Sequence, residues 1–261
     1  MPFFSANLNF LFNEVPFMER FKAAAQAGFK YVEFMFPYDY DLKEIKQQLI
    51  ENNLKLVLIN LPAGNWDEGD RGIAADPSRK EEFRIGVQKG IEAAEFLGVD
   101  KLNCLVGKVA GDYNEHEIMA NILDNVEYAA DEFNKVSLKL MLEPINRFDI
   151  PGFYLNTTEQ VMQIIKKLSR SNLFLQYDIY HAEREKENHE HIINEYISRI
   201  GHIQLADNPG RNQPGSGVVD FKYLIGLLEE KGYSGFIGME YKPIGSTLDS
   251  LSWVQEYGYK L

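Results

Sequence analysis

The sequence predicts a single (β/α)8 barrel domain that takes up residues 1–261. Strand-like and helix-like segments alternate from one end of the chain to the other, as in a parallel sheet with helices between its strands. Several strand-like segments end in a polar or acidic residue, and α/β barrels keep their functional groups at such strand ends. The 261 residues, 45% of them hydrophobic, suit one large core. A doubly wound open sheet is the alternative, but no glycine fingerprint follows the first strand.

The first half of the chain predicts four strand–helix pairs. Each expected strand is a short apolar run, and each expected helix repeats apolar residues at helical spacing. Gly28 and Gly98 close two of these helices. A long loop, 61–77, separates the third strand from its helix. The expected strands are 5–12, 31–36, 54–60 and 101–107, and the expected helices are 16–28, 42–53, 78–98 and 115–134.

The second half predicts four more pairs, beginning with the stretch LKLMLEPINRFD. In a strand, Leu138, Leu140 and Leu142 share one face while Met141 and Glu143 share the other. A face of three leucines favours contact with a covering helix, so Glu143 is expected to point into the barrel. The expected strands are 138–143, 173–180, 201–207 and 235–241, and the expected helices are 157–169, 191–200, 220–232 and 247–258.

Four polar groups lie at the carboxyl ends of the last four strands: Glu143, Asp178, Gln204 and Glu240. They are 35, 26 and 36 residues apart, about one βα unit each, so they come from adjacent strands and meet at the barrel mouth. Three carboxylates at that density repel one another and require a cation. Because the four residues supply only oxygen ligands, they favour Mg²⁺ or Mn²⁺ over zinc. The plainer interpretation is four ordinary polar strand ends, hydrogen-bonded across the mouth.

Such a site suits proton transfer next to a carbonyl group. A metal ion would polarise the carbonyl, and Glu143 and Glu240 would be placed to move a proton between adjacent carbons. His181 leaves the sixth strand on the loop side and is expected to contact a substrate. Lys242 follows Glu240 with the same strand parity, and Arg211 lies in the loop after the seventh strand.

Two loop features stay open at this point. The GSG segment at 215–217 could cradle a phosphate, or it could simply turn the chain ahead of a helix at Asp220. Trp66, in the long third loop, could cover a ligand or pin the loop.

Composition narrows the classes of partner. A net charge of −12, from 27 basic and 39 acidic residues, disfavours a nucleic-acid partner, which needs a basic face. The single cysteine, Cys104, cannot form an internal disulfide, which favours a reducing, cytoplasmic location. We expect no signal peptide and no membrane span, because no stretch approaches the roughly 20 apolar residues that cross a bilayer. The sequence does not decide between a monomer and a homo-oligomer.

Several segments carry a family resemblance over nearly the whole chain: NLPAGNWDEGDRGIAADPSRKEEF, NCLVGK, EPINRFDIPGFYLNT, QYDIYHAE, GHIQLADNPGRNQPGSG and GMEYKP. Through them the chain resembles hydroxypyruvate isomerase and its close relatives in the xylose-isomerase-like barrel superfamily. The resemblance implies that His181 and Arg211 lie near the substrate. The long third loop with Arg71 is similar to that of hydroxypyruvate isomerases and favours an acid substrate over a neutral sugar.

The same resemblance assigns roles at the strand ends. It implies that Glu143 and Glu240 are the paired proton donor and acceptor. It also implies that these two residues, with Asp178 and Gln204, hold a divalent cation. In related ketose 3-epimerases the third metal position is a histidine, whereas this chain has Gln204 there. Their metal preference therefore does not transfer directly.

Charge arithmetic supports an acid substrate. Three carboxylates and one divalent cation leave one negative charge, and a carboxylate substrate adds another. Such a substrate needs cations at the rim of the site. The candidates are Lys242, Arg211, Arg71 and Lys108.

The predicted function is an aldose–ketose type isomerase of a small hydroxy-oxo acid, with hydroxypyruvate converted to tartronate semialdehyde through a metal-held enediolate. A 2-oxo-tetronate isomerase or a ketose 3-epimerase is the alternative within this class. An apurinic-site endonuclease shares the barrel, but it would need a histidine-rich zinc cluster and a basic groove. A non-catalytic sugar-binding barrel is a further alternative, and the glutamate pair argues against it.

Overall fold

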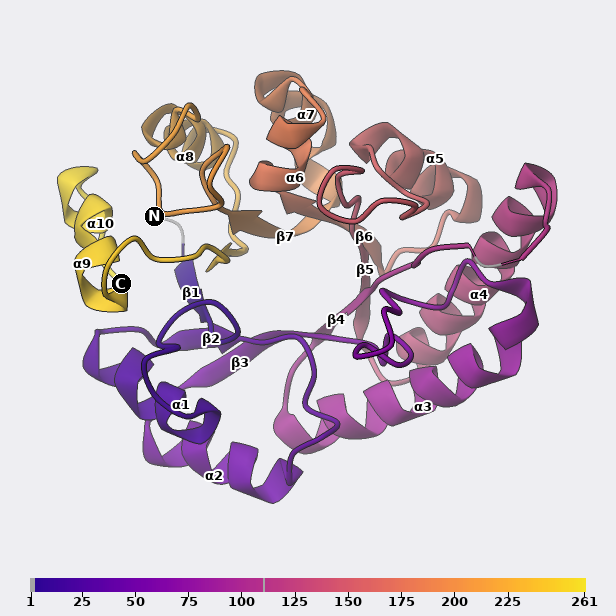
Figure 1. Ribbon diagram of the computed structural model, residues 1–261, viewed down its shortest axis with the longest axis horizontal. Helices are drawn as coiled ribbons and strands as arrows, with labels where there is room; N and C mark the ends of the chain where they lie inside the picture. Colours follow the sequence, from indigo (N-terminus) through magenta and orange to yellow (C-terminus); the bar gives the residue numbers. More distant parts are fainter. Residues whose placement is uncertain (1–2, 110) are drawn as a thin grey trace.

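Eight parallel strands close into one barrel in the order β1 to β8, in a computed structural model that describes residues 3–109 and 111–261. Figure 1 shows the helices arranged around the outside of this ring of strands. The predicted (β/α)8 barrel is therefore confirmed. The strands are β1 (Phe3–Asn7), β2 (Tyr31–Glu33), β3 (Lys55–Asn60), β4 (Lys101–Cys104), β5 (Lys139–Leu142), β6 (Leu173–Asp178), β7 (Ile200–Leu205) and β8 (Phe236–Met239).

Most of the helices lie between consecutive strands and cover the barrel wall. Two short 3₁₀ turns, η1 (Pro77–Arg79) and η2 (Ile197–Arg199), join helices to their neighbours. The helices are α1 (Phe17–Gln26), α2 (Leu42–Glu51), α3 (Lys80–Leu97), α4 (Glu115–Lys135), α5 (Thr158–Leu168), α6 (Ile179–Arg184), α7 (His189–Tyr196), α8 (Phe221–Glu230), α9 (Thr247–Ser250) and α10 (Ser252–Glu256).

Local sequence signals explain where several helices begin and end. Asn114 forms a capping box with Glu117 at the start of α4, so both side chains satisfy free backbone N–H groups. Thr157 caps α5 in the same way. Gly98 ends α3 with φ of 80°, a conformation that glycine adopts without the strain of a side chain.

Several predicted boundaries were wrong, and two of them have a clear local reason. The first strand ends at Asn7 instead of residue 12, because the Leu11 N–H donates to the Asn7 carbonyl and turns the chain. The sixth strand ends at Asp178 instead of residue 180, because the Asp178 carboxylate caps the extra helix α6. The helix predicted at 191–200 is α7 followed by η2, and the last predicted helix is two short ones, α9 and α10.

Register sets two of the predicted strand ends, Asp178 and Gln204, in one layer. Asp178 pairs with Gln204 across β6 and β7, and Gln204 pairs with Gly238 across β7 and β8. Apolar side chains fill the space between strands and helices, whereas the barrel interior below this layer holds buried polar groups such as Ser5 and Glu33. The interior is thus built to carry charge and hydrogen bonds.

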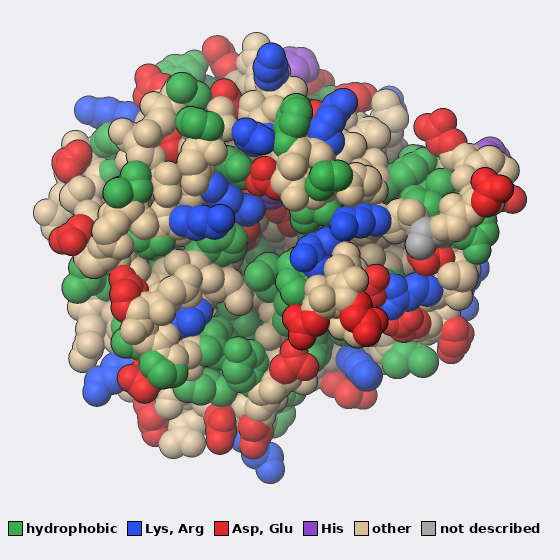
Figure 2. Space-filling view, in the orientation of Figure 1, with side chains coloured by type: hydrophobic (Ala, Val, Ile, Leu, Met, Phe, Trp, Pro, Cys, Tyr) green, Lys and Arg blue, Asp and Glu red, His purple; other side chains and the backbone are tan. Residues whose placement is uncertain are grey.

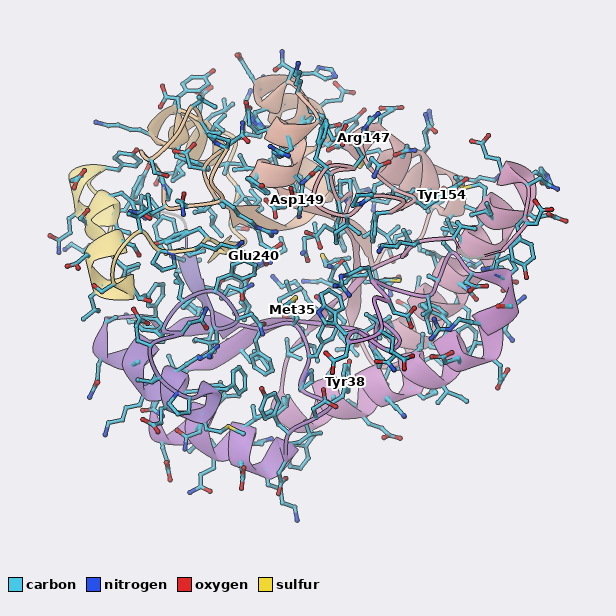
Figure 3. All side chains as sticks on the ribbon, in the orientation of Figure 1. Met35, Tyr38, Arg147, Asp149, Tyr154 and Glu240 are labelled. Atoms are coloured by element: carbon cyan, nitrogen blue, oxygen red, sulfur yellow. The ribbon has the colours of Figure 1, made fainter. Side chains whose placement is uncertain are left out.

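The end of the barrel seen in Figure 2 is hollowed near its centre, and basic side chains lie among the surrounding loops. In Figure 3, Glu240 and Met35 lie near the middle of the ring, whereas Arg147 and Tyr154 lie farther out on the loops. Within the described part of the chain, no helix has both the length and the apolar character needed to cross a bilayer.

Candidate active site

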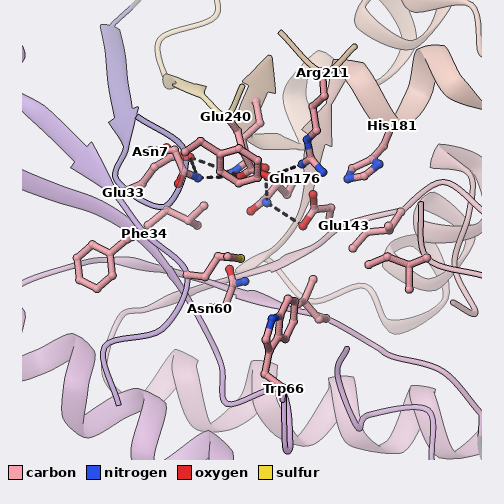
Figure 4. A pocket seen from close by; sticks show the side chains of 17 residues that line it. Asn7, Glu33, Phe34, Asn60, Trp66, Glu143, Gln176, His181, Arg211 and Glu240 are labelled. Carbon is pink, nitrogen blue, oxygen red and sulfur yellow. Dashed lines mark hydrogen bonds and ion pairs between the residues drawn. The ribbon is translucent and has the colours of Figure 1, made fainter. Parts of the chain in front are cut away.

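A cavity of about 140 Å³ opens at the carboxyl ends of the strands (Figure 4). One side is polar and holds Glu143, Gln204 and Glu240 of the predicted set, together with His181 and Arg211. The remaining lining residues are mainly apolar and aromatic. The structure therefore brings the main predicted groups together, although Asp178 is buried beside the cavity and does not line it. The apolar lining residues include Phe10, Phe34, Met35, Trp66, Leu105 and Ile145.

Glu143 has one engaged and one open carboxylate oxygen. Its Oε2 accepts hydrogen bonds from Asn103 Nδ2 at 2.6 Å and Gln176 Nε2 at 2.9 Å. No hydrogen bond to Oε1 is found from the described residues, and the side chain lines the cavity. Burial, reinforced by the charge of Asp178, raises the pKa of Glu143 to about 8. Glu143 thus presents an oxygen that can hold or release a proton near neutral pH.

Glu240 is held by three donors. Its Oε2 accepts from Asn7 Nδ2 at 2.8 Å and Gln204 Nε2 at 2.5 Å, and its Oε1 accepts from Arg211 Nη2 at 2.5 Å. Burial raises its pKa well above the ordinary value, Arg211 opposes that rise, and the charge of Asp178 adds to it. The charge of Glu143 also raises the pKa of Glu240, so the protonation of one carboxyl affects that of the other.

A second acidic layer lies directly beneath Glu240. Glu33 Oε2 accepts from Ser5 Oγ at 2.7 Å and faces His202 Nε2 at 2.8 Å, while its Oε1 accepts from Gln204 Nε2 at 2.9 Å and Asn7 Nδ2 at 3.3 Å. Burial alone would raise the pKa of Glu33, but His202 and the other donors lower it, so Glu33 is ionised. The negative charge of Glu33 orients the side-chain amides of Asn7 and Gln204 so that their nitrogens face the carboxylates of Glu33 and Glu240.

The sequence interpretation missed the roles of the amides in this network. Asn103 and Gln176 tie Glu143 in place, and Gln176 Nε2 also donates to Gln204 Oε1 at 2.7 Å. A signal was present, because Gln176 lies two residues before Asp178 and so shares its inward parity. Asn103 likewise lies on a strand whose register sets it beside Met141 of β5.

Asp178 combines a structural role with an unsatisfied oxygen. Its Oδ1 accepts from the backbone N–H groups of Tyr180 at 2.8 Å and His181 at 3.4 Å. Its Oδ2 is buried without a hydrogen-bond partner in the described part of the chain, with Arg211 Nη2 at 3.6 Å and His181 Nε2 at 3.5 Å. Burial raises the pKa of Asp178, and Arg211 opposes this. A buried, unpartnered carboxylate oxygen is the kind of group that a cation would satisfy.

The residues around Glu143 and Asp178 fit a divalent cation. Glu143 and Asp178 each offer a carboxylate oxygen, and these oxygens and a ring nitrogen of His181 lie within 4.8 Å of one another. Gln204 can add its Oε1, because a carbonyl oxygen that accepts from Gln176 keeps a second lone pair. Carboxylate and amide oxygens are ligands that Mg²⁺ and Mn²⁺ accept.

His181 faces the cavity as a hydrogen-bond donor. The side-chain Oδ1 of Asn146 accepts from the backbone N–H groups of Phe148 at 3.0 Å and Asp149 at 2.9 Å, which fixes the direction of the side-chain amide. Its Nδ2 therefore donates to His181 Nδ1 at 2.6 Å, and the ring proton of a neutral His181 lies on Nε2. Burial, with Arg211 nearby, lowers the pKa of His181 well below its ordinary value and keeps the ring neutral.

Arg211 places a cation between two of the carboxylates. Its Nη2 lies 2.5 Å from Glu240 Oε1 and 3.6 Å from Asp178 Oδ2. The guanidinium packs between the rings of Phe10 and Tyr180, 4.9 and 5.0 Å from their centroids. Burial would lower the pKa of Arg211, but Glu240 and Asp178 outweigh it and raise the pKa. Arg211 is thus a fixed positive charge in the wall of the cavity.

Three predicted substrate contacts do not line the cavity. Lys242 and Lys108 are exposed. Arg71 stacks on Trp66, 4.0 Å from the ring centroid, and donates to the backbone carbonyls of Trp66 and Asp70. Strand parity misplaced Lys242, because β8 ends at Met239 and the chain changes direction before Lys242 is reached. Direct contact with a substrate would require these side chains to move.

The GSG loop does not have free amides for a phosphate. The buried Asp207 Oδ2 accepts from the N–H groups of Gly215 at 3.0 Å and Gly217 at 2.8 Å, and its Oδ1 accepts from Val219 at 3.1 Å. The loop is therefore organised by a carboxylate of the protein itself. Of the two interpretations left open, the turn ahead of α8 is the one that the structure supports.

Comparison with known proteins agrees with this geometry. Residues 21–257 match the family model described as xylose isomerase-like TIM barrel. The chain is 47% identical to hydroxypyruvate isomerase of Escherichia coli over 254 residues, covering 97% of this chain and 98% of that protein. It is 36% identical to 2-oxo-tetronate isomerase of Haemophilus influenzae, covering 98% of this chain and 100% of the relative.

Solved structures share the fold. A Brucella melitensis structure described as AP endonuclease, family 2, superposes with a TM-score of 0.95 at 37% identity, covering 98% of this chain and 99% of that one. D-allulose 3-epimerase from Methylomonas sp. has a TM-score of 0.77 at 22% identity, covering 100% of this chain and 91% of that one, and shows the fold alone. The chain belongs to the xylose isomerase-like TIM barrel family, and it is an isomerase of the kind represented by its hydroxypyruvate and 2-oxo-tetronate isomerase relatives.

Proposed function

We propose that the chain isomerises a small hydroxy-oxo acid, with hydroxypyruvate to tartronate semialdehyde as the reaction that fits best. The observation that carries this proposal is the pair Glu143 and Glu240 on the walls of a small cavity, with Arg211 beside them. The names of the relatives support the substrate class, since both relatives act on acids of this kind.

The reaction moves one proton between neighbouring carbons. One glutamate of the pair removes a proton from C3 of hydroxypyruvate, which gives an enediolate, and the other delivers a proton to C2. The hydroxyl proton on C3 moves to the C2 oxygen, so that an aldehyde forms at C3. The raised pKa values of Glu143 and Glu240 suit this task, because the reaction needs one carboxylate and one carboxylic acid.

Two further groups act on the oxygens of the substrate. Arg211 can pair with the substrate carboxylate or with charge that develops on the enediolate oxygens. The Nε2–H of His181 points to the same cavity and can donate to the carbonyl oxygen. The apolar wall that includes Trp66 excludes water and strengthens these contacts.

A divalent cation, Mg²⁺ or Mn²⁺, would be held by Glu143 and Asp178, with Gln204 and Glu240 completing the set. When bound it would supply positive charge to the substrate carbonyl and its neighbouring oxygen. It would also satisfy Asp178 Oδ2, which lacks a partner in the described part of the chain.

The experiment is a substrate panel followed by proton NMR in deuterated water, with chelator or with Mn²⁺. Hydroxypyruvate should be converted with deuterium incorporated at C2, and Glu143→Gln and Glu240→Gln should each lose turnover. Epimerisation of a neutral ketose without turnover of any hydroxy-oxo acid would overturn the proposal and favour a 3-epimerase.

An apurinic-site endonuclease is the second candidate, because the Brucella melitensis relative is described as one. Against it, the net charge is −12, and the candidate metal group among the described residues contains one histidine. Incubation with DNA that carries an abasic site, with Zn²⁺ or Mg²⁺, should leave the strand intact.

A further inference from the structure

We propose that Trp66 limits the length of the substrate. Its indole forms the wall between the active-site cavity and a second hollow, and so confines the enzyme to short acids of three or four carbons. This inference rests on the proposed function, because it concerns the same cavity.

Two neighbouring hollows share Trp66 as a lining residue. The first is the active-site cavity of about 140 Å³, and the second has about 330 Å³ and is lined by the loops after β2 and β3. Phe36, Tyr38 and Pro62 line the second hollow. The side chain of Trp66 therefore separates a small polar site from a space more than twice as large.

The indole is held firmly in that position. The ring of Phe36 lies 5.1 Å from it between centroids, and the Arg71 guanidinium lies 4.0 Å from its centroid. Arg71 Nη1 also donates to the Trp66 carbonyl at 2.9 Å, and Asp70 Oδ2 accepts from the N–H of Asn65 at 2.7 Å. The predicted substrate contact Arg71 thus acts in this structure on Trp66, and the wall does not swing freely.

Position and size determine what the wall excludes. In Figure 4, Trp66 lies across the cavity from Glu240 and Arg211. A substrate whose carboxylate pairs with Arg211 and whose reacting carbons lie between the glutamates therefore points its far end at the indole. At about 140 Å³ the cavity is well below the roughly 300–1,000 Å³ of an ordinary small-molecule site, so it suits a three- or four-carbon acid better than a six-carbon chain.

The test compares wild type with Trp66→Ala on hydroxy-oxo acids of three to six carbons. Opening the wall should raise kcat/KM for the six-carbon acid relative to hydroxypyruvate by roughly ten- to two-hundredfold, the discrimination that one misplaced methylene group causes in a pocket. The ratio is the readout, because loss of water exclusion lowers both rates together. Trp66→Phe keeps an aromatic wall and should keep the wild-type preference. An unchanged ratio in the alanine variant would overturn the inference.

Two measurements separate this inference from the proposed function and from misfolding. Dissociation constants of unreactive 2-hydroxy acids of three to six carbons, measured by calorimetry, report length selection without turnover. Trp66→Leu keeps apolar contact with Phe36 and serves if the alanine variant unfolds. If the wild type turns over hydroxypyruvate but binds the six-carbon acid as tightly as the three-carbon acid, only the inference about Trp66 is refuted. Wild type that selects short acids without isomerising them refutes only the proposed reaction.

Discussion

Replacing Glu143 with glutamine should abolish turnover and yet stabilise the metal-free protein at alkaline pH. The amide can keep the two hydrogen bonds from Asn103 and Gln176 through its oxygen, so the fold should persist. It cannot accept a proton, so turnover should fall by about 10²–10⁴-fold. The stability gain arises because the buried carboxylate must ionise in the wild type and not in the variant.

The direction of the pKa shift of Glu143 determines whether the glutamine variant is more or less stable than the wild type. Burial and the charge of Asp178 raise the pKa of Glu143 in the folded protein from 4.5 to about 8. Such a carboxyl stabilises the fold below its ordinary pKa, and this stabilisation is lost as pH rises through about 8. At about 1.4 kcal/mol per pKa unit, the rise sets an upper limit of roughly 5 kcal/mol. The protonation of neighbouring carboxyls affects that of Glu143, so we expect a difference of about 2 kcal/mol, or about 4–8 °C in Tm.

Thermal melts at pH 5 and pH 8.5 in the presence of chelator measure this difference. Wild type and Glu143→Gln should melt together at pH 5, whereas the variant should melt higher at pH 8.5. Glu92→Gln, at an exposed position on α3, is the matched control and should follow wild type at both pH values. Parallel Tm profiles for wild type and Glu143→Gln would show that Glu143 is not the costly buried charge. More than about a tenth of wild-type activity would remove it from proton transfer.

Three further outcomes are expected. Arg211→Met should raise KM for hydroxypyruvate by up to about a hundredfold, since a charge-assisted hydrogen bond contributes roughly 1.5–3 kcal/mol. Lys242→Met, at an exposed position, should leave KM near the wild-type value. Equal effects of the two substitutions would mean that the substrate carboxylate is bound at the rim of the site. Mn²⁺ at a hundred times its Kd should stabilise the fold by about 2.7 kcal/mol and so raise Tm. Asp178→Asn should show a smaller rise in Tm. An identical rise in both proteins would place the ion elsewhere. Asn146→Ala should lower kcat roughly two- to tenfold at unchanged KM by releasing the tautomer of His181, and an unchanged kcat would show that the ring needs no such orientation.

The barrel and the residues at its mouth could be predicted from the sequence, because both follow from the hydrophobic periodicity and from the order of strands along the chain. Glu143 points inward because a leucine face directs it there, and Gln204 and Asp178 share a layer because adjacent strands of a barrel do. Predictions that rested on strand parity held within strands. They failed at Lys242, which lies beyond the end of β8, where the backbone no longer alternates.

Contacts between distant loops could not be predicted in this way. The direction of the Arg211 side chain depends on Phe10, in the loop after β1, and on Tyr180, in α6. The tautomer of His181 depends on Asn146, 35 residues away, whose own amide is fixed by a turn. Such orientations arise from tertiary packing, and a single sequence carries no periodic signal for them.

The negative charge that the sequence predicts at the strand ends can be balanced by an arginine as well as by a metal ion. Three carboxyl groups at the strand ends need positive charge, and Arg211 supplies part of it by contact with Glu240. That contact leaves Asp178 Oδ2 without a hydrogen bond in the described part of the chain, and Glu143 with a raised pKa. One guanidinium therefore neutralises one end of the site, and the unsatisfied end is where a divalent cation would add most. The same division of charge allows Arg211 to face a substrate carboxylate while Glu143 remains able to exchange a proton.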